Sequence, residues 1–127
     1  MTDTMPSAEQ IIAGMSAKMG AGQVPAAMRA AVTVAPELVQ QVAVSSQQSV
    51  GDESSPLDAK TRALVFMAAA LAAHDDECIK ATLASALAQG ITAAEMVAVI
   101  KIVRHSANNG VLGAATPILE ALAGAAA

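Results

Sequence analysis

The sequence predicts an all-α protein, and three observations support this fold class. Capping motifs and glycine stops recur along the chain, apolar residues repeat at three- and four-residue steps, and no window alternates as a strand would over more than a few residues. A chain of 127 residues is long enough for one domain with its own core. We therefore expect a single helical domain over residues 1–127.

The first expected helix begins at Ser7, where Ser7 and Gln10 have the spacing of a capping box. It should run to Met19 and end at Gly20, since glycine readily takes the left-handed conformation that terminates a helix.

Two further helices are expected before the middle of the chain. One covers residues 23–35, with Pro25 in its first turn, and the next opens at Pro36 and runs towards Val50. Residues 1–50 therefore form the N-terminal helices. Residues 51–56, rich in Gly, Ser and Pro, are the clearest loop.

The next helices are marked by aspartates that serve as N-caps. Asp58 caps a helix over residues 59–73, and Asp75 or Asp76 caps another that ends at Gly90.

The remaining helices follow a second capping box, Thr92 with Glu95. Asn108–Gly110 is predicted as a turn. Thr116–Pro117 suits a cap and first turn of a closing helix, or a kink at Pro117 within one longer helix. The expected apolar face after the capping box is formed by Met96, Val99, Ile100, Val103 and Ala107.

Composition restricts the partners. Apolar residues make up 54% of the chain, yet Phe66 is its only aromatic residue, so each side chain buries little area and we expect self-association to add more. A net charge of −4 with scattered basic residues argues against nucleic acid. The longest apolar run, residues 63–73, is too short to cross a membrane. With no secretory signal and a single cysteine, a cytoplasmic location is expected.

Two segments carry a family resemblance. The helix start Leu57–Val65, with its Leu-Asp and Arg-x-Leu, and the frame Ala86-Leu87-x-x-Gly90-x-Thr92-x-x-Glu95 resemble the carboxymuconolactone decarboxylase and alkyl hydroperoxidase D (AhpD-like) superfamily over residues 57–120. The resemblance implies an AhpD-like helical bundle that forms a homo-oligomer, usually a trimer or hexamer. It also implies peroxiredoxin-like antioxidant activity, as an oxidoreductase, or decarboxylase activity.

The chain departs from the residues that this resemblance implies for catalysis. Counted back from Gly90, Cys78 falls at the second cysteine of the family's Cys-x-x-Cys pair, whereas Asp75 stands at the first. The family histidine is replaced by Thr82, and the upstream glutamate falls near Ala63. A disulfide within one chain is therefore excluded. The peroxidase mechanism lacks the first cysteine, the histidine and the glutamate, and the decarboxylase mechanism lacks the histidine.

Cys78 is either a small buried hydrophobe or a reactive thiol. In the first turn of a helix it meets the positive end of the helix dipole, which lowers a thiol pKa. Its neighbours Asp75, Asp76 and Glu77 are anionic and raise that pKa. The acidic residues also fit an ordinary charge bias at a helix start.

His74 precedes Cys78 by four residues and would share a face with it if one helix passed through both. The expected helix boundary falls between them, so His74 also fits a plain helix-end residue. A metal site here is disfavoured because consecutive acidic residues radiate around a helix. We expect neither a metal nor a cofactor.

His105 and its neighbour Arg104 lie in a polar cluster that is either a solvated helix end or the border of a pocket near Cys78. In the second case His105 partly replaces the missing histidine, and Thr82 and Arg104 are the candidate substrate-binding residues.

Three functions follow from these residues. In the first, a peroxide oxidises the Cys78 thiolate to a sulfenic acid that an external thiol reduces. In the second, the protein is a non-catalytic helical oligomer that binds a small molecule or serves as a scaffold. In the third, the organic acid is a lactone acid, which undergoes decarboxylation or isomerisation with help from Arg62, Arg104 and His105.

Overall fold

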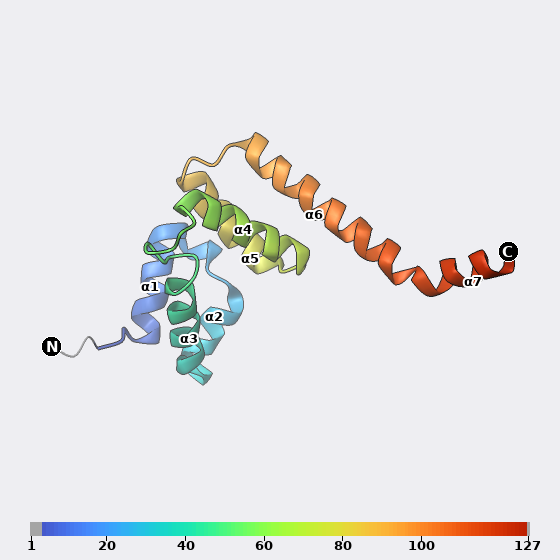
Figure 1. The fold of residues 1–127 in the computed structure, drawn as a ribbon. Coiled ribbons are helices and arrows are strands. Elements are labelled where there is room, and N and C mark those ends of the chain that lie inside the picture. The colour runs from blue at the N-terminus through green and yellow to red at the C-terminus, as the bar shows by residue number, and fades with distance from the viewer. Residues whose placement is uncertain (1–3, 127) are drawn as a thin grey trace.

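The structure, a computed structural model, describes residues 4–126 and shows an all-α chain without strands over that range (Figure 1). The all-α prediction is confirmed. The helices are α1 (Ala8–Met19), the 3-10 turn η1 (Ala21–Gln23), α2 (Ala26–Val34), α3 (Pro36–Gln47), α4 (Ala59–Ala72), α5 (Asp76–Ala88), α6 (Ala93–Ala114) and α7 (Thr116–Ala126).

Helices α1, α2 and α3 pack together in the N-terminal part of the chain. The predicted capping box is present: Ser7 Oγ accepts from the Gln10 amide at 3.2 Å, and Gln10 Oε1 accepts from the Ser7 amide at 2.8 Å. The helix expected from residue 23 begins instead at Ala26, because Gln23 belongs to the 3-10 turn and Pro25 is the N-cap.

A second packing unit consists of α4, α5 and the first turns of α6. Helix α4 contacts both α5 and α6, so it is the central element of this unit. Small and medium aliphatic side chains fill the core, as the composition predicted. The buried members are Ala63, Met67, Ala86, Ile91 and Val99, and Leu64, Ala68, Met96 and Val103 pack against them.

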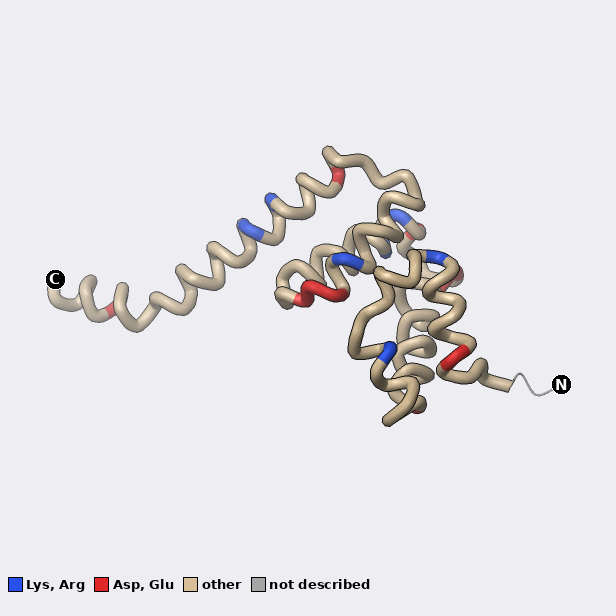
Figure 2. Tube along the Cα trace, turned by 180° about the vertical axis from the view of Figure 1, so that it is seen from behind, with Lys and Arg blue, Asp and Glu red and all other residues tan. Residues whose placement is uncertain are grey.

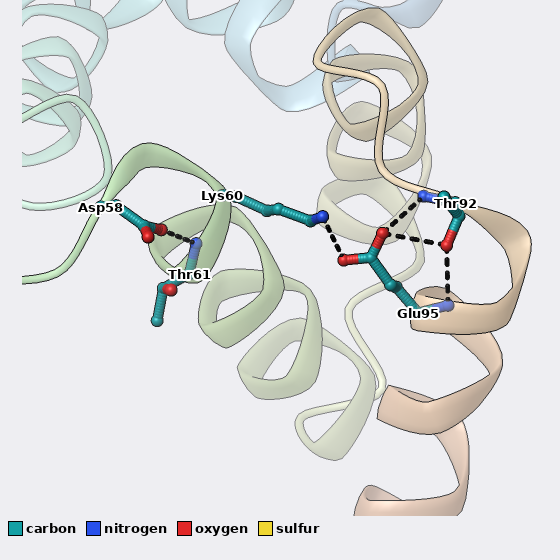
Figure 3. Close-up of polar contacts among 5 residues, drawn as sticks. All are labelled: Asp58, Lys60, Thr61, Thr92 and Glu95. Carbon is teal, nitrogen blue, oxygen red and sulfur yellow. Dashed lines mark hydrogen bonds and ion pairs between the residues drawn. The ribbon is translucent and has the colours of Figure 1, made fainter.

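Polar contacts fix the start of α6 against the start of α4 (Figure 3). Thr92 and Glu95 form the predicted capping box. Glu95 Oε2 also forms an ion pair with Lys60 Nζ, at 2.6 Å. Asp58 caps α4 by accepting a hydrogen bond from the Thr61 amide at 2.8 Å. The Glu95 carboxylate therefore stabilises the N-terminus of α6 and also links this helix to α4.

The C-terminal part of the chain is a helical arm that projects from the body (Figure 1). Here the predicted turn at Asn108–Gly110 is wrong, because α6 continues through it to Ala114. Turn-forming residues are a weak preference that an already extended helix overrides. The arm bends after Ala115, where Pro117 cannot donate to the carbonyl four residues back. The Thr116 hydroxyl donates to that Gly113 carbonyl instead, at 2.6 Å.

None of the helices within residues 4–126 combines the length and the hydropathy that a membrane span needs.

Candidate functional site

The single cysteine opens onto a large apolar cavity that lies among α2, α3, α4 and α5. Its volume is about 810 Å³, and it is partly open to solvent. Most of its wall is aliphatic, with Phe66 contributed by α4. Three apolar side chains on this wall remain substantially exposed: Leu38 at 50%, Val42 at 48% and Phe66 at 37%. Exposed apolar side chains gathered around a hollow are typical of a surface that something covers.

Helix α5 presents one face to this cavity. Cys78, Ala81, Thr82 and Ser85 line it, and their three- and four-residue steps place them on the same side of the helix. Thr82 is buried, and its hydroxyl donates to the Cys78 carbonyl oxygen at 2.6 Å. The structure thus brings together two of the predicted site residues, Cys78 and Thr82.

Helix α3 and the turn after it supply further polar lining residues, which the sequence analysis missed. Gln41, Ser45 and Ser49 line the cavity at steps of four residues. These residues lie outside the segment that carried the family resemblance, so nothing linked them to Cys78. Their four-residue spacing was the available signal, but other polar residues of the same helix obscure it.

The environment of the Cys78 thiol disfavours its ionised form. Partial burial raises the pKa of Cys78 to about 11, with further contributions from the hydrogen bond and the charge of Asp75 and from the charge of Glu77. The Cys78 amide donates a hydrogen bond to Asp75 Oδ1 at 3.1 Å, which places the anionic N-cap of α5 beside the cysteine. At pH 7 the neutral thiol therefore predominates over the thiolate.

His74 ends α4 and does not share a helix with Cys78. It adopts the left-handed conformation, with φ of 54°. The Asp75 amide donates to the Ala70 carbonyl at 3.0 Å, and the His74 amide donates to the Leu71 carbonyl at 3.2 Å. This is a Schellman motif, which closes one helix before the next begins. The side chain of His74 is exposed and does not line the cavity.

His105 and Arg104 lie on the exposed side of α6, which packs against α4. The His105 Nε2 and Asn109 Nδ2 atoms are 3.3 Å apart, one turn along the same helix. Neither His105 nor Arg104 lines the cavity, so one chain does not bring these residues to Cys78.

Acidic residues cluster at the start of α5 (Figure 2), and two of them have structural partners. Asp75 caps the helix, and Glu77 lies 3.8 Å from the Lys80 ammonium. Within residues 4–126, no three His, Cys, Asp or Glu side chains gather in a way that would hold a metal ion.

Comparison with known protein families places the chain in context. The model of the carboxymuconolactone decarboxylase family matches residues 36–121, more than half of the chain. It confirms the resemblance and extends it towards the N-terminus, since the matched segment already begins at α3. A search of curated proteins finds no relative that matches the chain.

Proposed function

The chain belongs to the carboxymuconolactone decarboxylase family, and on this premise we propose that it binds a small, uncharged and largely apolar molecule in the cavity beside Cys78, without using the thiol as a nucleophile. The observation that carries the proposal is the cavity itself, which combines a volume of about 810 Å³ with exposed apolar walls.

The residues that line the cavity favour a ligand without charge. Gln41, the serines of α3 and α5, Thr82 and the neutral Cys78 are the polar groups, and no Lys, Arg, His, Asp or Glu is among the lining residues. A carboxylate ligand would be buried without a compensating cation, which is costly. A hydroxyl or carbonyl group would find donors and acceptors along α3.

The volume suits this class of ligand. Small-molecule sites enclose roughly 300–1,000 Å³, with mostly apolar walls and a few polar groups that fix orientation. An aliphatic molecule of this kind would cover Leu38, Val42 and Phe66, which water otherwise contacts. Burial of apolar surface supplies about 25 cal/mol per Å².

Binding of the neutral dye Nile red, followed by its fluorescence, tests this proposal. Ala81→Phe fills the cavity and should weaken binding at least several-fold. The matched control Ala88→Phe adds the same ring to an exposed residue of α5 that does not line the cavity. Equal binding by both variants would contradict the proposal. So would a change in molar mass in Ala81→Phe alone, because a second copy would then be the occupant.

A second candidate function is a thiol peroxidase that uses Cys78 alone, and it is favoured by the position of Cys78 on the cavity wall. A peroxide would oxidise the thiolate to a sulfenic acid, and an external thiol would reduce it. The raised pKa of Cys78 makes the required thiolate scarce at neutral pH. Peroxide consumption that Cys78→Ser abolishes, with helix content unchanged, would establish this function in place of the first.

A further inference from the structure

Asn109 and Gly110 are neighbours in the second half of α6, and both are exposed. The chain contains two asparagines, Asn108 and Asn109, and Asn109 is the one that precedes a glycine. Among residues 4–126, no atom outside this stretch of helix lies within 4 Å of the position that a Cβ on Gly110 would occupy. Because glycine lacks the Cβ that shields a backbone amide, the amide nitrogen of Gly110 is open to reaction with the Asn109 side chain.

We propose that Asn109 is a site of spontaneous deamidation, a covalent modification that this helix slows but does not prevent. The amide nitrogen of Gly110 attacks Cγ of Asn109 and bonds to it, and Nδ2 leaves as ammonia together with the amide proton. Water then opens the resulting succinimide ring at either carbonyl carbon. The product is aspartate or its β-linked isomer, isoaspartate. The reaction consumes water, releases ammonia and needs no oxidant, reductant or enzyme.

The intact helix holds the reacting atoms apart. A helical side chain leans back towards the N-terminus of its helix, whereas the amide nitrogen of Gly110 lies on the C-terminal side of Asn109. His105 supports this position of the Asn109 side chain, because Asn109 Nδ2 lies 3.3 Å from His105 Nε2, one turn earlier in α6. The reaction therefore requires a local opening of α6 that separates Asn109 from His105.

The second half of α6 has little packing within this chain to prevent such an opening. Over residues 4–126, Val103 is the last residue of α6 that packs against the core of the body. Beyond it, Val111 and Leu112 are 72% and 63% exposed, and the arm projects away from the body (Figure 1). Helical segments shorter than about 12–15 residues are marginal in water without tertiary contacts, and glycines weaken them further. This part of α6 therefore opens more often than the helices of the body.

Deamidation changes the arm irreversibly. Isoaspartate continues the chain through its β-carbon, which adds an atom to the backbone and breaks the regular hydrogen-bond spacing of the helix. Aspartate, the other product, adds a negative charge without interrupting the backbone. The isoaspartate form therefore loses helix around residue 109, and α7 loses its fixed direction relative to the first half of α6. The cavity beside Cys78 keeps its shape, because its lining residues all precede α6.

Peptide mapping by mass spectrometry tests the site on the intact chain. After days at physiological temperature and mildly alkaline pH, Asn109 should be converted to isoaspartate and aspartate, with a loss of helix signal in circular dichroism. Asn108 is an internal control that shares the helix and the exposure, and it should stay largely unmodified because the residue after it is not a glycine. Equal conversion of both asparagines, or no conversion of Asn109 in the folded chain, would overturn the proposal.

Two glycine variants separate the chemistry from the stability of the helix. Gly110→Ala places a Cβ beside the attacking nitrogen and also favours the helix, so it should slow the deamidation of Asn109 at least several-fold. Gly113→Ala favours the same helix but leaves the pair Asn109–Gly110 unchanged, and it should slow the reaction less. Equal slowing in the two variants would contradict the assignment of the Gly110 nitrogen as the attacking atom.

A second pair of variants tests the restraint by His105. His105→Ala and Ser106→Ala both replace a residue of similar helix propensity by alanine, and the first also removes the contact with Asn109. Asn109 should therefore be converted faster in His105→Ala than in Ser106→Ala, and faster still in the wild-type chain unfolded in guanidinium. Equal rates in the two variants, or a folded chain that reacts as fast as the unfolded one, would overturn the role of α6 and His105.

Discussion

At the scale of single residues, Cys78 shows how the surroundings of a group decide its chemistry. The sequence contains both influences on this thiol, the helix dipole that lowers its pKa and the anionic neighbours that raise it. It does not reveal how much water the thiol loses on folding, and this desolvation is the largest contribution in the structure. The balance falls on the raised side, so the neutral thiol is favoured over the thiolate.

The raised pKa predicts slow alkylation of Cys78 at neutral pH. The rate with iodoacetamide should rise about tenfold per pH unit and approach its maximum only near pH 11. When the chain is unfolded in guanidinium, the pH at which the alkylation rate reaches half its maximum should fall near the ordinary thiol pKa of about 8.5. The pKa of Cys78 is higher in the folded chain than in the unfolded chain. Its contribution to the free energy of unfolding is therefore fully present below pH 8.5 and is lost as the pH rises through about 11. A midpoint below 8.5 in the folded protein would contradict the assignment.

A second residue, His74, should be replaceable by glycine with a gain in stability. A side chain in the left-handed conformation costs about 1 kcal/mol, which glycine avoids. His74→Gly should therefore raise the free energy of unfolding by about that amount in urea titrations. Gly90 holds the equivalent position after α5, with φ of 74° and no atom near an added Cβ. The reverse substitution at that position, Gly90→Ala, is the control and should lower the free energy of unfolding. A loss of stability in His74→Gly would contradict the strain argument.

At the scale of helices, the sequence predicted the starts better than the ends. Ser7, Asp58, Asp75 and Thr92 all cap helices in the structure, because a cap depends on residues within one turn. The predicted turn at Asn108–Gly110 failed for a related reason. Turn-forming residues act only where the chain is otherwise free to turn, and α6 continues through them.

The start of α6 allows a prediction about capping. Thr92→Ala removes the acceptor for the Glu95 amide and should lower the free energy of unfolding by about 1 kcal/mol. Urea denaturation followed by circular dichroism measures this change. Thr92→Ser keeps the hydroxyl and serves as the control. Equal losses in both variants would show that the methyl group, and not the cap, is responsible.

Glu95 makes the same helix start sensitive to acid. The ion pair with Lys60 and the hydrogen bonds from Thr92 lower the pKa of Glu95 below its usual value. A carboxyl with a lowered folded pKa favours folding above its unfolded pKa, and that contribution is lost as the pH falls through the folded value. Glu95→Gln should therefore lower the melting temperature at pH 7 and have less effect at pH 3. An equal decrease at both pH values would contradict this account.

At the scale of the whole molecule, the cavity joins two parts of the chain that the sequence analysis treated separately. Cys78 and Thr82 come from the segment with the recognisable family frame, whereas Gln41 and Ser45 come from the N-terminal helices. Periodicity predicts each helix and its apolar side, but not which helix it packs against. The fold class was therefore predictable, and half of the candidate site was not.

The same limit explains the placement of His105. Its position near the end of an expected helix suggested a group that borders the pocket of Cys78. The structure instead directs α6 along α4 and outward into the arm, so His105 lies outside the cavity in one chain. A long-range packing choice of this kind has no local signature in the sequence.

The central claim is that the cavity binds an uncharged apolar molecule, and a thermal-shift titration with a matched ligand pair tests it most directly. 1-Decanol and decanoate share a chain length and differ in charge at pH 7. Decanol should raise the melting temperature in proportion to its occupancy, and decanoate should not, because no cation lines the cavity. The decanol shift should disappear in Ala81→Phe and persist in Ala88→Phe. An equal or larger shift with decanoate, or a decanol shift that survives Ala81→Phe, would contradict the claim.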